Sequence, residues 1–411
     1  MAQHESMLWF KTQSPHPLAA TFLVRTLMDP RYYYGIRQLA AECLVIHADP
    51  VAHWVGWRHL EKAYHELFCY PGTKMPQPND FSNKQAYEVA KSIPKAVSQI
   101  RIPDGTCPKE ARHFILDQLR FNDNGSNEYS DNYKVANLLA ALADSLLPVK
   151  KKKDGAEEMV FGTADEDDEE DPEPHQFRDI VVEELDRYRR SDEWTHSYHN
   201  IYTTTVLECK WKLMNAGVIP QDPMEFAQYL HDGTSDHVRV KAWEALIDLG
   251  FLTEDSVAAL LLTVLSTDSS PYVRGHLFET FCFGLASIAL GEHTVAEAPP
   301  PPGVDGEGDM LIIEEETSNT ARKDHIARTT SIVGALAALK LELKFNASLK
   351  EAIWKAVQSS VLTLSEERDL LDICLVLYDA EDSLILKLRY PRFWRVEKIG
   401  KVCSVCTSPG F

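Results

Sequence analysis

The sequence lacks the long apolar runs, the targeting segment and the dense cysteine framework that mark membrane and secreted proteins. No run of 18 apolar residues occurs, so no segment is predicted to span a membrane. The N-terminus, MAQHESMLWFKTQSPHP, has no basic stretch followed by an apolar core, so we do not predict a signal peptide; it resembles a segment cut from a longer protein. Most of the eight cysteines lie far apart and in apolar helical contexts, which predicts buried free thiols in the cytoplasm or nucleus.

The sequence also lacks the usual catalytic signatures. It has no GxxxxGK[ST] loop, no GxGxxG after a strand and no GxSxG elbow. Two HE dipeptides are followed by Cys69 and Leu8 where a zinc peptidase would carry its second histidine. Cys403 and Cys406 form a single CxxC without the second pair that a structural zinc site needs. We therefore predict no active site, no metal, no cofactor and no small-molecule substrate.

Basic residues are in short supply. Lys and Arg total 42 against 62 Asp and Glu, a formal net charge of −20. Such a chain repels polyphosphate overall, so any contact with nucleic acid would need a local basic patch. Much of the excess lies between Asp165 and Glu173, which predicts a folded part less acidic than the total suggests.

Two segments are predicted to be disordered. Residues 150–176 begin with four lysines and continue through GTADEDDEEDPEPHQ, a composition that cannot bury enough apolar surface to offset its ordering entropy. The lysines are either a weak import signal or the solvated end of a linker. Residues 291–320 contain EAPPPPGVDGEGD and form the second flexible loop. Within it, Met310–Ile313 is an apolar island that docks on the fold or a partner, or stays weakly ordered.

Elsewhere apolar residues recur at helical spacing, with almost no strand pattern. Residues 131–148 place five apolar side chains on one helical face and stop at a proline. Residues 201–207 have strand propensity but lie inside a longer helical frame, so we predict helix there. Further helices are predicted over 322–341, 347–362 and 365–379.

Residues 234–290 predict three consecutive helices. Asp236 caps the first, and Gly250 supplies the left-handed residue that ends it. Thr253 starts the second, and Pro271 opens the third at the first helical position. The predicted inward faces are Val238, Ala242, Ala245, Leu246 and Leu249 in the first helix, and Val257, Leu260, Leu261, Val264 and Leu265 in the second.

A short pattern repeats along the chain. Val238-Arg239 and Val273-Arg274 occupy matching places 35 residues apart, and Ile36-Arg37 repeats the theme. An aspartate, a β-branched residue with arginine, and small apolar residues at helical spacing are typical of HEAT repeats. We predict an all-α fold, an irregular HEAT/ARM-like helical repeat solenoid with two disordered loops; an irregular helical bundle is the alternative. The arginines are expected to bond aspartates or carbonyls of the neighbouring repeat.

The chain is accordingly divided into five predicted parts. These are N-terminal helical repeats (1–149), the acidic linker (150–176), HEAT-like repeats (177–290), the Pro/Gly/acidic loop (291–320), and C-terminal helices with a basic aromatic tail (321–411).

Two surface signals stand out. Three consecutive tyrosines, 32–34, cannot all face one core, so at least one should be exposed. The tail from Lys387 to Lys401 interleaves basic and aromatic residues, which suits nucleic acid or an acidic protein segment. Alternatively its aromatic residues pack on the last repeat while its charges are solvated. The candidate contact residues are Arg389, Arg392, Trp394, Arg395 and Lys398.

Several long blocks resemble one family. They include DPRYYYGIRQLAAECL, FILDQLRFNDNGSNEYSDNYKVANLLAALADSL, LDRYRRSDEWTHSYHNIYTTTVLECKWKLMNAGVIP and LKLRYPRFWRVEKIGKV. These blocks resemble the subunit 2 family of the general transcription factor TFIID, the TATA-binding-protein-associated factors related to M1 aminopeptidases, and fungal members most of all. They cover most of the chain outside the two loops.

The resemblance implies a role and a set of partners. Family members carry an aminopeptidase-like region, regarded as catalytically inactive, followed by the helical-repeat region to which this chain corresponds. The resemblance implies a nuclear scaffold that contacts other TFIID subunits, notably subunits 8 and 1, and promoter DNA around the initiator. No residue motif of the family assigns these contacts here.

Two rival functions stay open. A metallopeptidase fragment would bind stoichiometric zinc. An importin-like HEAT adaptor would bind localisation-signal peptides or a small GTPase.

Overall fold

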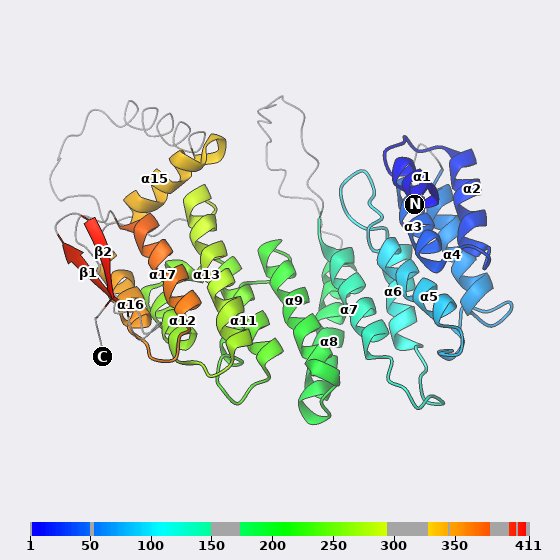
Figure 1. The fold of residues 1–411 in the computed structure, drawn as a ribbon. Helices are drawn as coiled ribbons and strands as arrows, with labels where there is room; N and C mark the ends of the chain where they lie inside the picture. The colour runs from blue at the N-terminus through cyan, green and yellow to red at the C-terminus, as the bar shows by residue number, and fades with distance from the viewer. Residues whose placement is uncertain are drawn as a thin grey trace, which may run out of the picture. The chain divides into compact units, whose positions relative to one another are not determined.

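The chain forms an array of short helices that divides into two compact units. The computed structural model describes residues 2–49, 53–148, 173–293, 328–343, 346–378, 394–399 and 402–407, with backbone only for 173–175 and the last two ranges. Unit 1 spans Met1–Asp222 and unit 2 spans Pro223–Phe411 (Figure 1). The predicted all-helical repeat class is confirmed. None of the helices in the described part combines the length and apolar character needed to cross a membrane.

In unit 1, helices that are two positions apart along the chain pack against each other in one continuous row. Helices α1, α3, α5, α7 and α9 contact one another in this order, and α2 packs on α4. This alternation is how helix-pair repeats bury a continuous core between neighbours. The helices are α1 (Ala2–Phe10), α2 (Pro17–Met28), α3 (Tyr34–Ile46), α4 (Val55–Phe68), α5 (Lys84–Val97), α6 (Lys109–Arg120), α7 (Asn132–Leu146), α8 (Glu173–Trp194), the 3-10 turn η2 (Tyr198–Asn200) and α9 (Ile201–Asn215).

Unit 2 follows the same rule. Helix α11 packs on α13, α13 on α15 and α15 on α17, while α12 packs on α16. The elements are α10 (Met224–Ala227), α11 (Asp236–Asp248), the 3-10 turn η3 (Phe251–Thr253), α12 (Asp255–Thr267), α13 (Pro271–Leu290), α15 (Ile332–Leu343), α16 (Ala347–Val357), α17 (Leu364–Leu377), β1 (Trp394–Ile399) and β2 (Val402–Thr407).

The three helices predicted over 234–290 are present, with small corrections. Ser235 rather than Asp236 is the N-cap of α11, and Gly250 has a φ of 93°, as the predicted left-handed stop requires. A 3-10 turn comes first, so α12 begins at Asp255 and not at Thr253. The prediction that Leu260 faces inward is wrong, because it is 47% exposed. The buried stripe of α12 is Ala258, Leu261, Leu262 and Leu265, a spacing of three and four that turns position 260 outward.

The acidic tract is an insertion within unit 1. Helix α8 begins at Glu173. Residues 173–176 therefore belong to this helix and not to the predicted linker, whose predicted end is residue 176. Helix α7 precedes the tract and packs on both α8 and α9, which follow it. The unit boundary falls instead after Asp222. The rest of the predicted linker, and residues 294–320 of the second predicted loop with Met310–Ile313, lie outside the described residues.

The C-terminal segment contains strands that the sequence analysis did not predict. Strands β1 and β2 pair antiparallel, with Trp394 opposite Thr407 and Ile399 opposite Val402. Both strands are six residues long, and two residues, Gly400-Lys401, connect them. A two-residue connection that begins with glycine between β-branched segments is typical of a hairpin. The charged residues Arg395, Glu397 and Lys398 dilute the apolar pattern of β1, so the sequence favours a charged tail there over a strand.

The three repeat arginines are buried anchors. Arg37, Arg239 and Arg274 are each 4% exposed. Arg37 Nε donates to the carbonyl oxygen of Leu27 at 2.8 Å. Arg239 Nη2 donates to Asp268 Oδ2 at 2.6 Å, and Arg274 Nη1 donates to the Asp268 carbonyl at 2.9 Å. The expectation that these arginines bond aspartates and carbonyls is confirmed, so they hold neighbouring helices together.

Arg274 also bonds to a residue of helix α17. Its Nε donates to Glu366 Oε1 at 2.9 Å, at the first turn of α17. Thr363 and Glu366 form a capping box there. Burial alone would raise the pKa of Glu366, but the hydrogen bonds from Arg274 and Thr363 lower it overall. The carboxylate therefore stays charged and ties α13 to α17.

A polar cluster that the sequence analysis did not identify joins the loop before α5 to the start of α7. Asn79, Asp131 and Lys134 are each less than 9% exposed. Lys134 Nζ donates to Asn79 Oδ1 at 2.5 Å, and Asn79 Nδ2 donates to Asp131 Oδ2 at 2.9 Å. Asn122 Nδ2 donates to the same carboxylate oxygen at 2.6 Å. The asparagine-rich stretch FNDNGSNEYSD was the available sequence signal.

We predict that Asp268→Ala destabilises unit 2 strongly. The Asp268 side chain is 3% exposed, and its removal leaves the buried Arg239 guanidinium without its most buried partner. Breaking one side of such a pair costs roughly 3 kcal/mol or more. Thermal unfolding of the variant should show a clearly lowered midpoint. Glu351→Ala is the control, because it breaks a pair with Lys355 in which both side chains are about two-thirds exposed or more, and it should leave the midpoint unchanged. Equal midpoints for both variants would contradict the anchoring role.

We also predict that Lys134 makes unit 1 more stable as the pH rises. Burial, opposed by the charge of Asp131, lowers the pKa of Lys134 from 10.5 to about 8. Between these pH values the folded state binds fewer protons than the unfolded state, so the free energy of unfolding increases with pH. The gain is at most about 3 kcal/mol, at about 1.4 kcal/mol per pKa unit.

The measurement is urea denaturation between about pH 7.5 and 10.5, comparing the wild type with Lys134→Met. Tyrosines and cysteines that are buried in the fold titrate in this range once the chain is unfolded, so the informative quantity is the difference between the two proteins. This difference should move in favour of the wild type as the pH rises. Lys355→Met, at an exposed position, is the control and should run parallel to the wild type. A parallel curve for Lys134→Met would show that Lys134 stays protonated in the folded state.

Candidate docking surfaces

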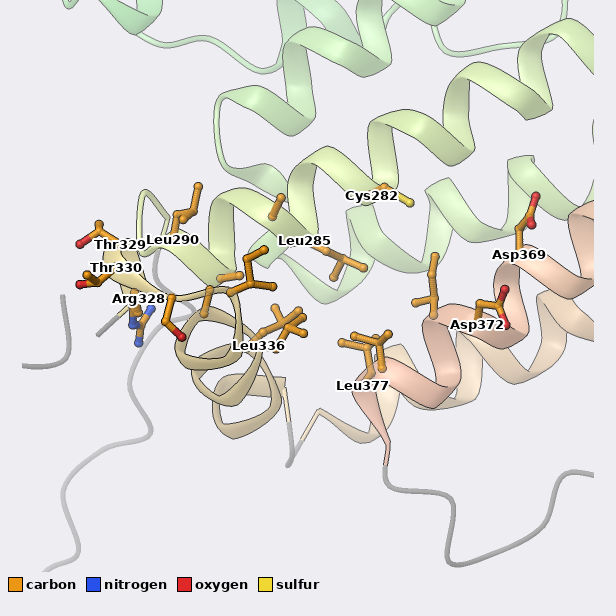
Figure 2. Close-up of a pocket in the computed structure, with 18 of the residues that line it drawn as sticks. Cys282, Leu285, Leu290, Arg328, Thr329, Thr330, Leu336, Asp369, Asp372 and Leu377 are labelled. Carbon is orange, nitrogen blue, oxygen red and sulfur yellow. The ribbon is translucent and has the colours of Figure 1, made fainter. Parts of the chain in front are cut away.

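An apolar cavity lies in unit 2 between α13, α15 and α17. We call it the α13–α17 groove. Its volume is about 690 Å³, within the range of ligand and peptide sites. Figure 2 shows Leu285, Leu336 and Leu377 directed toward the open space, with Cys282 above them. The remaining apolar lining is Phe278, Ala286, Ala289, Leu290, Ile332, Ala335, Leu339, Ile373 and Val376.

The groove exists because three helices meet around small residues. Helix α15 has the sequence IVGALAALKLEL, apolar on nearly every side, but only Leu339 and Leu343 are buried. Ile332 and Val333 are 81% and 77% exposed. Alanines at positions 286 and 335 leave space that larger side chains would fill. An apolar helix exposed in this way is typical of a surface that binds another protein.

The two ends of the groove differ in charge. Asp369 and Asp372, on α17, lie at one end, as Figure 2 shows. Arg328 lies at the other end, where its Nη2 contacts Glu342 Oε1 at 2.6 Å. Burial and the nearby charge of Asp369 raise the pKa of Cys282, which therefore stays a neutral thiol. The groove thus combines an apolar floor with a negative end.

The predicted contact residues of the C-terminal tail are only partly placed. Trp394, Arg395 and Lys398 lie in β1, where Arg395 is opposite Cys406 and Lys398 is opposite Cys403. Arg389 and Arg392 lie outside the described residues. The structure brings the CxxC strand beside the basic strand, but it does not describe the side chains of either.

The HE dipeptide at position 65 lies on α4, beside two shallow polar hollows. His65, Glu61 and Lys74 line both of them. Burial lowers the pKa of His65, so the imidazole is neutral at pH 7. Cys69 Sγ donates a weak hydrogen bond to the Lys74 carbonyl at 3.8 Å. Across the described ranges, no three histidine, cysteine, aspartate or glutamate side chains are grouped closely enough to hold a metal ion.

The tyrosine cluster behaves as predicted. Tyr33 is 61% exposed and Tyr32 is 37% exposed, while Tyr34 is half-buried and contacts the Tyr33 ring at a centroid distance of 4.5 Å. Tyr32 and Tyr33 precede α3 and Tyr34 is its first residue, so the three rings offer a small aromatic surface on unit 1.

Comparison with known proteins identifies the family. Residues 1–287 match the family model described as TAF2-like, TPR repeats. TPR repeats have a period of 34 residues, close to the 35-residue spacing of the Val-Arg pairs, whereas HEAT repeats are longer. Both repeat types stack helix pairs.

Three curated relatives illustrate the similarity, and each is named transcription initiation factor TFIID subunit 2. The Schizosaccharomyces pombe protein is 33% identical over 393 residues, covering 95% of this chain and 32% of that protein. The Gallus gallus protein is 29% identical over 68% of this chain and 23% of its own length. The Saccharomyces cerevisiae protein is 23% identical over 91% of this chain and 27% of its own length.

The chain therefore spans about a third or less of the curated relatives that it matches. A family model covering residues 1–287, a fungal relative at 33% identity and the alternating helix packing agree with one another. The chain belongs to the TAF2-like family of helical-repeat proteins.

Proposed function

We propose that this chain is the non-catalytic, helical-repeat scaffold of a TFIID subunit. It contributes to the assembly of TFIID and to core-promoter recognition at the initiator, in the preinitiation complex of RNA polymerase II. The proposal rests on one observation, the match of residues 1–287 to the TAF2-like family. Its partners are other TFIID subunits, notably subunits 8 and 1, and its location is the nucleus.

The packing of the helices supports a scaffold. The apolar residues are used to join helix to helix, which leaves long outer surfaces for partners. Cys43 in α3 and Cys107 in the loop before α6 are poor nucleophiles, because burial raises the pKa of each to about 11. Such thiols fill the core and do not act in catalysis.

The proposed contact with promoter DNA belongs to the basic aromatic tail. A chain with a net charge of −20 needs a local basic patch to approach phosphates. Arg389, Arg392, Trp394, Arg395 and Lys398 provide the densest combination of positive charge and aromatic rings in the sequence.

Affinity purification of the chain from nuclear extract tests the assembly role. We expect TFIID subunits, including subunit 8, among the co-purifying proteins. Capture of a small GTPase and of localisation-signal peptides, without TFIID subunits, would instead identify a transport-type adaptor and overturn the proposal.

The tail is tested by Arg392→Glu with Arg395→Glu in the assembled complex. Each lost phosphate contact weakens binding and flattens its salt dependence, so promoter binding should fall by about tenfold or more at low salt. Lys62→Glu with Lys355→Glu is the matched control, because both side chains are more than two-thirds exposed and lie elsewhere on the chain. Unchanged assembly and unchanged promoter binding in the tail variant would remove the tail from the interface.

A further inference from the structure

The α13–α17 groove is surrounded by exposed apolar side chains. Phe283 is 73% exposed, Leu290 and Val376 are each 40% exposed, and Ile332 is 81% exposed. These residues continue the apolar lining onto the surface of unit 2. A contiguous patch of this kind is unfavourable in water and is typical of an interaction site.

The length of the groove fits a helix. Its floor runs along α13 from Phe278 to Leu290, a difference of twelve residues that corresponds to roughly 18 Å at 1.5 Å per residue. Helix α15 packs on both α13 and α17, and residues of all three helices line the groove. Figure 2 shows the lining residues spread from Leu290 and Thr329 at one end to Asp369 at the other. An elongated apolar groove between helices suits the apolar face of a further helix of about three turns.

The charged residues at the two ends of the groove determine which kind of helix it would favour. The positive charge of Arg328 is offset by Glu342 at 2.6 Å. At the opposite end, the nearest basic side chain on α17 is Arg368, whose Nε lies 3.9 Å from Asp372, with both side chains more than 60% exposed. Such a pair is weak in water, and Asp369 adds a second carboxylate. The groove therefore favours an occupant with positive charge at this end.

The apolar island of the chain itself does not meet this requirement. Met310–Ile313 is preceded by Asp309 and followed by three glutamates, 314–316. Four negative charges beside Asp369 and Asp372 would oppose docking. A segment of opposite charge is needed.

We propose that the α13–α17 groove binds an amphipathic helix of a partner protein, with the apolar face of that helix against Leu285, Leu336 and Leu377 and its basic residues beside Asp369 and Asp372. The inference deepens the proposed scaffold function and rests on it. Binding uses i, i+3, i+4 and i+7 apolar anchors, as in other helix-in-groove complexes.

The test uses the whole chain and two synthetic peptides of about 14 residues, long enough for three turns. Both carry leucines at i, i+3, i+4 and i+7; one has lysines in a terminal turn and the other has glutamates at the same positions. We expect the basic peptide to bind about tenfold more tightly at low salt, as measured by fluorescence anisotropy. Added salt should reduce this preference, because the contacts are at the rim.

Two variants separate the apolar contribution from the charge contribution. Ala286 is an exposed residue of the groove lining, so Ala286→Trp should fill part of the groove without disturbing the core. This variant should bind both peptides about tenfold or more weakly than the wild type does. Ala337→Trp, exposed on α15 but outside the lining, should bind both peptides as the wild type does. Asp369→Asn with Asp372→Asn should abolish the preference for the basic peptide. Glu254→Gln with Glu351→Gln, at exposed positions elsewhere in unit 2, should retain it.

Four results would overturn the proposal. They are the absence of binding by either peptide, a preference that survives in the double Asp variant, tighter peptide binding after deletion of residues 309–316, and a dimer in light scattering that Ala286→Trp dissociates. The third result would identify the chain itself as the occupant, and the fourth would identify a second copy. Each leaves co-purification with TFIID subunits unaffected, so it counts against the groove and not against the scaffold function.

Discussion

The helices α1, α3, α5, α7 and α9 of unit 1 each pack against the next helix of this series, and the remaining features of that unit depend on this repeated contact. Helix α7 shows the principle, since Leu138, Leu139 and Leu142 are at most 1% exposed and α5 and α9 both pack against it. Because every contact is with a near neighbour, the array tolerates long insertions. Closing a longer loop adds little entropy cost, so the acidic tract between α7 and α8 leaves the row intact.

Buried polar contacts at the helix ends fix the position of one helix relative to the next, which apolar packing alone does not. Apolar stripes alone allow helices to slide, whereas a buried ion pair has a single good geometry. In unit 2, Arg239 and Arg274 both converge on Asp268, through its carboxylate and its carbonyl. In unit 1, the Asn79 cluster has the same role, because it attaches an otherwise exposed loop to the start of α7. These charged and amide groups bond to one another inside the fold, where Arg239 Nε is the one nitrogen of its guanidinium without a hydrogen-bond partner.

The same packing rule leaves a gap where the row of unit 2 is incomplete. Helices α13, α15 and α17 meet around alanines, so their apolar sides do not fully cover one another. The result is an apolar groove with two carboxylates, Asp369 and Asp372, at one end. A scaffold that joins subunits needs such surfaces more than it needs a catalytic pocket, which connects the fold to the proposed role.

Short sequence patterns were sufficient to predict the helices of unit 2 and the repeat class. Helical spacing, Gly250 and Ser270-Pro271 predicted the helices of unit 2, and the repeated Val-Arg pairs predicted both the repeat class and the buried arginine bonds. The helix signals depend on residues close in sequence, and the Val-Arg pairs are visible as a repeat, so both can be predicted from the sequence.

Other features were decided only by tertiary structure. Leu260 faces solvent because the partners of α12 select the stripe one residue further on. Gly56 is required because a Cβ there would lie 2.6 Å from the backbone nitrogen of Ala48, where α4 crosses the end of α3. The unit boundary at Asp222 and the α13–α17 groove also depend on which helices meet. Such contacts join residues far apart in the chain, and no local spacing records the distance between them.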